Sequence, residues 1–293
     1  MKLRQGLIYL SLLFLGACGS SSISGSTNQI STTPESTNAS PTVVAFPSGD
    51  KTLHGYLSKP AGNGPFPVVI FNHGSEPDPG PRESLEKFYT DLGFLVFEPH
   101  RTGHGLSADA GTDIITQTEA LQGQGLSPQE MQAAIWDLHE TANEDVIASV
   151  QWLKSQPDVD TSRIAMSGCS YGGIQTIITA EKSVSLGLGI RAFVPFAPGA
   201  QSWNNYLSAN MTQSVQNASP PIFLIQAEND YSLGPSEVLG PILESKPDPN
   251  GYKDYPAFGT TVEEGHCGFS LNPKAIPIWS PDVLGFFEAT GVM

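Results

Sequence analysis

One serine of the chain stands between two glycines, in the segment Met166–Gly173 that reads MSGCSYGG. Gly168, Ser170 and Gly172 match the pattern G-x-S-x-G, with apolar residues before and after it. In that context the pattern places a serine on a tight turn between a strand and a helix. We therefore predict Ser170 as a nucleophile and the Tyr171 N–H, at the helix start, as a donor to an oxyanion.

A serine hydroxyl is a weak nucleophile and needs a histidine base, which a carboxylate must orient. Of the six histidines, only His266 follows Ser170 in the chain, in the segment EGHCG. It fits the chain order serine, acid, histidine that accompanies this serine turn. Asp230, in the segment AEND after an apolar run, is the predicted acid, and Glu228 in the same segment is the reserve candidate.

A second oxyanion donor is expected from the loop after an earlier strand, where the sequence reads NHGS at residues 72–75. We choose the Ser75 N–H as that donor. His73 is predicted to be a packed, hydrogen-bonded structural residue. The later segment RTGHGLS is predicted to be a structural turn that buries His104 and pins Arg101.

Two cysteines adjoin the predicted catalytic residues, because Cys169 precedes Ser170 and Cys267 follows His266. Since the serine and the histidine must approach each other, their neighbours are expected to be close as well. In an oxidising compartment the cysteines could form a disulfide that tethers the histidine loop. This requires a Cα–Cα distance of about 4.4 to 6.8 Å. A pair of small buried thiols is the alternative.

Short β-type runs alternate with helix-length segments along residues 43–293, which is typical of a sheet covered by helices. We predict an α/β fold with a doubly wound, mostly parallel sheet of about eight strands and helices on both faces. The predicted strands are 43–46, 53–57, 68–71, 94–97, 164–166, 192–196, 222–225 and 252–255. The predicted helices are 81–92, 127–155, 173–180, 236–243 and 281–290.

Two segments do not fit this alternation. Residues 106–127 are rich in Gly, Gln and Thr and are predicted to form an irregular insertion. Residues 199–219 hold Trp203, Tyr206 and Met211 among Asn and Ser. Both segments leave the sheet at the carboxyl ends of strands, where ligands bind in such folds. They are therefore candidates for pocket walls, with plain surface loops as the alternative.

The first 18 residues have the features of a targeting segment. Met1–Arg4 carries two basic side chains, Leu7–Phe14 is largely apolar, and small residues precede Cys18. The apolar run is too short to span a bilayer, so we predict a secretory signal. The cysteine at the cut resembles the lipobox of bacterial lipoproteins, with an ordinary cleaved signal as the alternative. We expect secretion across the inner membrane and a lipid anchor on Cys18.

The remaining chain is predicted to be a tether over residues 19–42 and one folded domain over residues 43–293. The tether is mostly Ser, Thr, Gly and Asn, with almost no apolar side chain to bury. Gly19 after the cysteine resembles lipoproteins sent to the outer membrane. The net charge of −15 repels phosphate backbones, so nucleic acid is not an expected partner.

Five segments together resemble the dienelactone hydrolase family of the α/β-hydrolases: NHGS, RTGHGLS, GCSYGG, AEND and GHCGF. They occur in the right order and cover most of residues 50–290. The resemblance implies hydrolysis of lactones or other carboxylic esters of small molecules, with no metal and no cofactor. Dienelactone hydrolases proper have a cysteine as nucleophile, whereas this chain has Ser170 there and its cysteine one residue earlier. This departure favours a generic ester over a dienelactone.

Two other functions stay open. Related α/β-hydrolases cleave peptides, but they usually carry a large additional domain over the site, for which we expect no room in residues 43–293. An envelope binding protein that lost catalysis would be free to lose a catalytic residue. Here every predicted member of the catalytic triad is present, which favours an enzyme.

Overall fold

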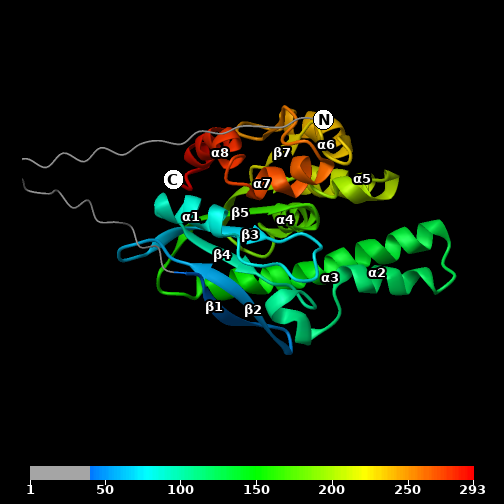
Figure 1. The fold of residues 1–293 in the computed structure, drawn as a ribbon, viewed down its shortest axis with the longest axis horizontal. Helices are drawn as coiled ribbons and strands as arrows, with labels where there is room; N and C mark the ends of the chain where they lie inside the picture. Colours follow the sequence, from blue (N-terminus) through cyan, green and yellow to red (C-terminus); the bar gives the residue numbers. More distant parts are fainter. Residues whose placement is uncertain (1–39) are drawn as a thin grey trace, which may run out of the picture. The chain divides into compact units, whose positions relative to one another are not determined.

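The computed structural model describes residues 40–293, so the predicted signal, Cys18 and nearly all of the predicted tether lie outside the described residues. The described chain forms an eight-stranded sheet with helices on both faces (Figure 1). The strands are β1 (Thr42–Ser48), β2 (Lys51–Ser58), β3 (Phe66–Asn72), β4 (Leu95–Pro99), β5 (Val159–Cys169), β6 (Ile190–Phe196), β7 (Phe223–Ala227) and β8 (Gly251–Tyr255). The α-helices are α1 (Glu83–Asp91), α2 (Ile114–Gln122), α3 (Pro128–Lys154), α4 (Tyr171–Lys182), α5 (Asn205–Asn217), α6 (Gly234–Glu244), α7 (Phe269–Leu271) and α8 (Ile276–Thr290).

The strand order is β1-β2-β4-β3-β5-β6-β7-β8. The hairpin β1–β2 is antiparallel and joins the sheet through an antiparallel pairing of β2 with β4. All other neighbours are parallel. The predicted doubly wound, mostly parallel sheet is thus confirmed. The carboxyl ends of the parallel strands lie at one edge of the sheet, where the loops that bear functional residues gather.

The two faces of the sheet are buried in two separate cores. In β3, Val68 and Ile70 belong to the core that α3, α4, α5 and α6 cover. The alternate residues Val69 and Phe71 belong to the core that α1, α7 and α8 cover. This alternation follows from the two-residue side-chain period of a strand, and it explains why the central strands read as continuous apolar runs.

The prediction that residues 106–127 are irregular is wrong for most of that segment. A short 3₁₀ helix, Gly105–Ala110, is followed by the α-helix α2. The carboxylate of Asp113 caps α2 by accepting hydrogen bonds from the N–H groups of Ile115 and Thr116. The helix packs on α3 rather than on the sheet. Its few apolar residues among Thr and Gln therefore gave no clear helical period.

Helix α3 begins at the predicted place, where Ser127 and Glu130 form a capping box. Together α2 and α3 form a helical hairpin that extends away from the sheet (Figure 1). The segment 199–219, which had no assigned structure in the prediction, also contains a helix, α5, capped by the Asn204 side chain. Among the described helices, none combines the length and apolar character that crossing a membrane requires.

Candidate active site

The predicted serine turn lies between the end of β5 and the start of α4. Ser170 has φ 57° and ψ −118°, a backbone conformation that non-glycine residues rarely adopt. A Cβ on Gly172 would lie 2.0 Å from the Asn72 carbonyl oxygen, and one on Gly168 would lie 2.5 Å from the Gly172 oxygen. Close packing around the turn therefore requires glycine at both positions of the motif. The strained turn holds the half-buried serine at the carboxyl edge of the sheet.

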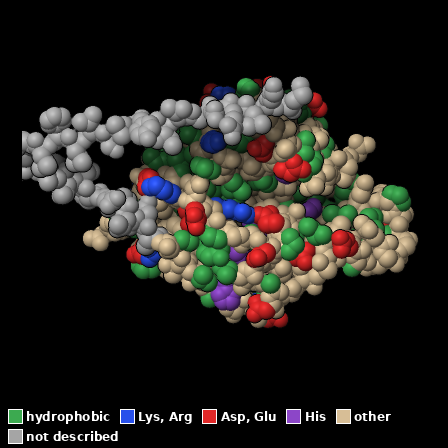
Figure 2. All heavy atoms as spheres, in the orientation of Figure 1, with side chains coloured by type: hydrophobic (Ala, Val, Ile, Leu, Met, Phe, Trp, Pro, Cys, Tyr) green, Lys and Arg blue, Asp and Glu red, His purple; other side chains and the backbone are tan. Residues whose placement is uncertain are grey.

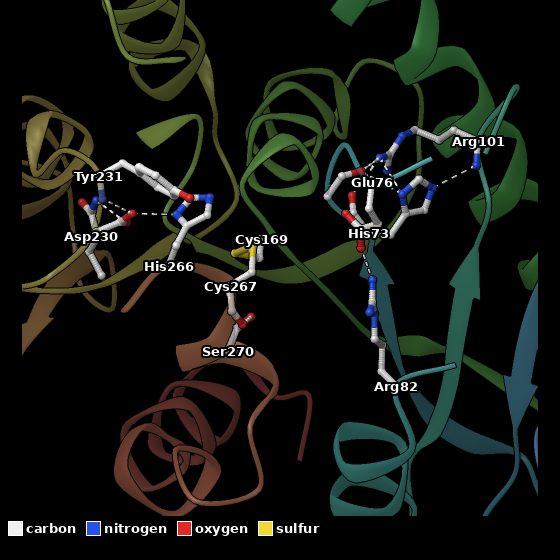
Figure 3. The surroundings of a disulfide bond; sticks show 12 residues. His73, Glu76, Arg82, Arg101, Cys169, Asp230, Tyr231, His266, Cys267 and Ser270 are labelled. Carbon is white, nitrogen blue, oxygen red and sulfur yellow. Dashed lines mark hydrogen bonds and ion pairs between the residues drawn. A yellow bond between two sulfur atoms is a disulfide. The ribbon is translucent and has the colours of Figure 1, made fainter. Parts of the chain in front are cut away.

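Asp230 and His266 form a buried hydrogen-bonded pair in which Nδ1 of the imidazole lies 2.6 Å from Oδ1 of the carboxylate. The Asp230 side chain is fully buried and that of His266 is 8 % exposed. Glu228, the reserve candidate, is exposed at the surface. Tyr231 packs edge-on against the imidazole with ring centroids 5.1 Å apart (Figure 3). The structure thus brings Asp230 rather than Glu228 to the histidine.

Two residues that sequence reasoning missed hold this pair in place. Gln226, at the end of β7, donates a hydrogen bond of 2.8 Å to the second carboxylate oxygen of Asp230. Asn229 donates to the carbonyl oxygens of Phe258 and Thr261, both in the loop that leads to His266. The AEND segment therefore supplies the acid and also anchors the histidine loop. Gln226 lies near the end of a buried strand and Asn229 just after it, which was the only sequence signal for them.

The disulfide Cys169–Cys267 joins the serine turn to the histidine loop, with the two Cα atoms 5.7 Å apart (Figure 3). It therefore connects the neighbours of Ser170 and His266, as the disulfide hypothesis expected. The Nε2 atom of His266 is buried and has no hydrogen-bond partner. A histidine base would accept the serine proton on this atom, and because the atom has no partner it is free to do so.

Cys169, His266 and Cys267 are also the one group of described residues whose potential metal-ligand atoms gather, within 4.8 Å of one another. A zinc-type site needs cysteine thiolates as ligands. The two sulfur atoms here are bonded to each other, so they offer no thiolate. In its disulfide form this group does not fit a metal site.

A cavity of about 400 Å³ opens beside Ser170, and Ser75 and Tyr171 line it together with the serine. The two predicted oxyanion donors and the nucleophile thus share one cavity. Its remaining walls come from α2, α3, α4 and the segment around α5, so both segments predicted as pocket walls contribute. These walls consist of Ile114, Ile115, Thr118, Glu119, Gln122, Gln132, Ile135, Trp136, His139, Ile174, Gln201, Ser202, Asn204, Tyr206 and Leu207.

The cavity is lined mainly by apolar and neutral polar side chains. Glu119 is its one acidic lining residue, and no lysine or arginine in the described chain lines it. Burial, with the nearby Arg101 cation, lowers the pKa of His139 to about 4, so this imidazole is neutral near pH 7. The arrangement suits a neutral, largely apolar ligand group.

The other predicted structural residues are buried beneath this cavity. His73, Arg101 and His104 are each 1–2 % exposed, as expected for a structural role. His73 Nε2 accepts a hydrogen bond from the Arg101 backbone N–H, at 3.2 Å. His104 Nδ1 donates to the Glu76 carbonyl oxygen, at 2.8 Å.

In Figure 2 the acidic side chains are spread over the visible face rather than gathered in one patch.

The sequence was compared with family models and with curated proteins. Residues 113–237 match the family model of X-Pro dipeptidyl-peptidase (S15 family), which covers less than half of the chain. A sequence search of curated proteins finds no match.

Three solved structures illustrate the likeness of the fold. Acylaminoacyl peptidase from Pyrococcus horikoshii is 17% identical with a TM-score of 0.59, over 86% of this chain and 42% of its own. The esterase from Pyrobaculum calidifontis is 15% identical with a TM-score of 0.59, over 88% of this chain and 86% of its own. Dienelactone hydrolase from Anabaena variabilis is 16% identical with a TM-score of 0.54, over 85% of this chain and 98% of its own.

The chain spans about two fifths of the length of the peptidase, but nearly all of the dienelactone hydrolase. At these identities the likeness concerns the fold. The eight-stranded, mostly parallel sheet with helices on both faces matches these structures, and the chain has the α/β-hydrolase fold.

Proposed function

We propose that the protein is a serine hydrolase that cleaves carboxylic esters or lactones of small molecules through an acyl-enzyme. His266 Nε2 takes the proton of Ser170 as the serine oxygen attacks the ester carbonyl carbon. The N–H groups of Ser75 and Tyr171 bind the oxygen that becomes negative. His266 then protonates the departing alcohol, and a water molecule releases the acid by the same steps in reverse order. Asp230 keeps the imidazole oriented throughout.

One observation carries this proposal: a disulfide joins the strained serine turn to the loop of a buried, hydrogen-bonded carboxylate–imidazole pair whose second nitrogen has no partner. A buried nitrogen without a partner costs free energy, so its presence here indicates a functional role rather than a stabilising one. An envelope protein that only binds ligands has no need for this arrangement, so the catalytic interpretation is favoured over the binding protein.

The cavity supports a neutral, apolar group on one side of the scissile bond. Its volume of about 400 Å³ falls in the range of pockets that bind small molecules. The walls lack a cation that would select an acidic substrate. We therefore favour uncharged esters of medium-sized acyl or alcohol groups over acidic esters or lactones.

A peptidase is the second candidate, because residues 113–237 match a family model of dipeptidyl-peptidases. The matched segment includes the helices that wall the cavity as well as the serine turn. Peptide cleavage by the same residues would need the same acyl-enzyme. Only the substrate distinguishes the two proposals.

The test compares hydrolysis of p-nitrophenyl esters of increasing acyl length with hydrolysis of peptide p-nitroanilides, including X-Pro dipeptides. The matched control is Ser170→Ala. We expect ester turnover in the parent protein and a loss of about 10⁵- to 10⁶-fold in the variant. Equal rates in both proteins would exclude Ser170 as the nucleophile. Turnover of the anilides in the absence of ester turnover would favour the peptidase.

We also propose that the protein is secreted and anchored in the bacterial envelope by lipid on Cys18. The anchor rests on the sequence before the described residues. The Cys169–Cys267 disulfide supports an oxidising compartment, because such bonds are rare where thiols are kept reduced. Replacing Cys18 by serine should release the protein from membranes, which fractionation of the cells would measure.

A further inference from the structure

Arg101 is a buried cation with no carboxylate of the described chain in direct contact; burial lowers its pKa, and the more distant charges of Glu76 and Asp145 offset only part of that effect. Its side chain follows β4, and the residue is only 1 % exposed. Within residues 40–293 no carboxylate forms an ion pair with it, although Arg82 nearby pairs with Glu76 (Figure 3). Two of its guanidinium nitrogens, Nε and Nη1, have no hydrogen-bond partner. Burying such a charge is costly, so stability alone does not explain this residue.

The guanidinium binds the backbone of the loop that carries Ser75. Nη2 donates hydrogen bonds of 2.7 Å to the carbonyl oxygens of both His73 and Gly74 (Figure 3). On its other side the guanidinium carbon lies 4.3 Å from the centroid of the Tyr171 ring. Arg101 therefore contacts the segments that carry both oxyanion donors.

The Gly74 carbonyl oxygen also receives a second hydrogen bond. His73 Nε2 accepts from the Arg101 backbone N–H, so the proton of the neutral imidazole is on Nδ1. Nδ1 lies 2.8 Å from the Gly74 oxygen and donates to it, while Arg101 Nη2 lies 3.0 Å from the same Nδ1 and directs its hydrogens to the two carbonyl oxygens instead. Burial and the Arg101 charge hold the pKa of His73 well below its usual value, so the ring stays neutral.

The Gly74 carbonyl and the Ser75 N–H belong to one peptide unit. In a planar trans peptide these two groups point in opposite directions. Two donors on the carbonyl therefore fix the direction of the N–H, and the adjacent cation makes that N–H a stronger donor. Ser75 lines the catalytic cavity.

We propose that Arg101 is a positioning residue that aligns and polarises the oxyanion hole through the Gly74–Ser75 peptide and the ring of Tyr171. The inference rests on the proposed function, in which the N–H groups of Ser75 and Tyr171 stabilise the oxyanion. Arg101 touches no substrate atom in this role. It fixes the direction of the N–H groups that bind the oxyanion.

The test uses Arg101→Met and Arg101→Lys, with Arg82→Met as the matched control. Arg82 is a partly buried arginine of the same region whose guanidinium pairs with the Glu76 side chain but, unlike that of Arg101, binds neither the Gly74 carbonyl oxygen nor the Tyr171 ring. Two quantities are measured for each protein: kcat and KM on a p-nitrophenyl ester, and the inhibition constant of a trifluoromethyl ketone. Ser170 adds to that ketone and forms a tetrahedral oxyanion. Titration with a fluorophosphonate gives the concentration of active sites, which normalises every rate.

We expect Arg101→Met to lower kcat by about 10- to 100-fold, somewhat less than the loss of an oxyanion donor itself. KM should stay within about twofold, and the ketone should bind more weakly by the same factor as kcat, because both report the oxyanion. Arg101→Lys should recover part of the loss, because an ammonium can still donate to the Gly74 oxygen. Arg82→Met should keep the parent values.

An unchanged kcat in Arg101→Met, or a lower kcat with unchanged affinity for the ketone, would overturn the inference. A purely structural role would reduce the number of titrated sites and leave the ketone affinity of those sites intact. If Arg101→Met does not fold, the Arg101→Lys variant provides the test. We expect it to lower kcat and the affinity for the ketone by about threefold or more. Parent values of both quantities would refute the inference. A parent protein without ester turnover would instead refute the proposed function.

Discussion

At the scale of single residues, the choice of the acid can be tested with two neighbouring carboxylates. Asp230 is buried and bonded to His266, whereas Glu228 two residues earlier is exposed. We expect Asp230→Asn to lower kcat by about 10³- to 10⁴-fold, because the amide no longer holds the imidazole in its active tautomer. Glu228→Gln should change kcat by less than about twofold. Ester hydrolysis by both variants checks this, and the opposite pattern would assign the acid to Glu228.

The residues that could be predicted from the sequence are those whose catalytic role requires a recognisable local motif or a fixed order along the chain. Ser170 and its glycines follow from the crowded turn, and His266 follows from chain order. Gln226 and Arg101 could not be assigned their contacts, because these depend on which loops meet at the sheet edge. An isolated glutamine or arginine next to a strand carries no such information. Their partners became visible only with the tertiary structure.

At the scale of the elements, the disulfide connects two loops that are 98 residues apart in the sequence. A crosslink of that span stabilises a fold by about 4 to 5 kcal/mol in the chain-entropy description. We expect Cys169→Ala/Cys267→Ala to lower Tm by several degrees and kcat by about tenfold or more, because the histidine loop loses its tether to the serine turn. Differential scanning calorimetry and ester kinetics measure the two effects. A parent protein with two titratable thiols would show that the bond is absent.

The hairpin of α2 and α3 should set the choice of substrate, because half of the residues that line the cavity come from it. Trp136 is the largest side chain that it contributes. We expect Trp136→Ala to shift the preferred p-nitrophenyl ester toward longer acyl chains, with at least about a fivefold change in the ratio of kcat/KM values. Val184→Ala, at an exposed position away from the cavity, should leave the ratio unchanged. The same ratio in both variants would exclude the hairpin as a specificity element.

The same hairpin shows why element prediction succeeded for the sheet and failed here. Strands buried on both faces read as apolar runs, which is a strong signal. Helix α2 packs on one other helix and faces the cavity with its remaining side, so its sequence lacks a single apolar stripe. The side chains of an element that lines a site are selected for contact with the ligand as well as for packing in the core. Their pattern is correspondingly weaker.

At the scale of the whole molecule, a group of buried histidines makes the stability depend on pH. Burial is the main reason that the pKa values of His73, His100, His104 and His139 are lowered, to about 3 for His100 and about 4 for His139. An unfolded histidine has a pKa of about 6.5. Below that pH the unfolded chain therefore binds protons that the folded chain does not, and the free energy of unfolding falls as the pH falls. Burial raises the pKa values of Glu98 and Asp254, and these two carboxyl groups act in the opposite direction.

His139→Phe isolates one of these contributions. Each lowered histidine contributes a slope of up to about 1.4 kcal/mol per pH unit between its folded pKa and about 6.5. The imidazole packs against the Tyr171 ring, and its Nδ1 has no partner, so a phenyl ring can replace it without leaving a polar group unpaired. We expect urea unfolding of the variant between pH 4.5 and 6 to show a slope shallower by about that amount. A slope equal to that of the parent protein would mean that His139 is protonated in the folded state, and the cavity would then offer a cation to an acidic substrate.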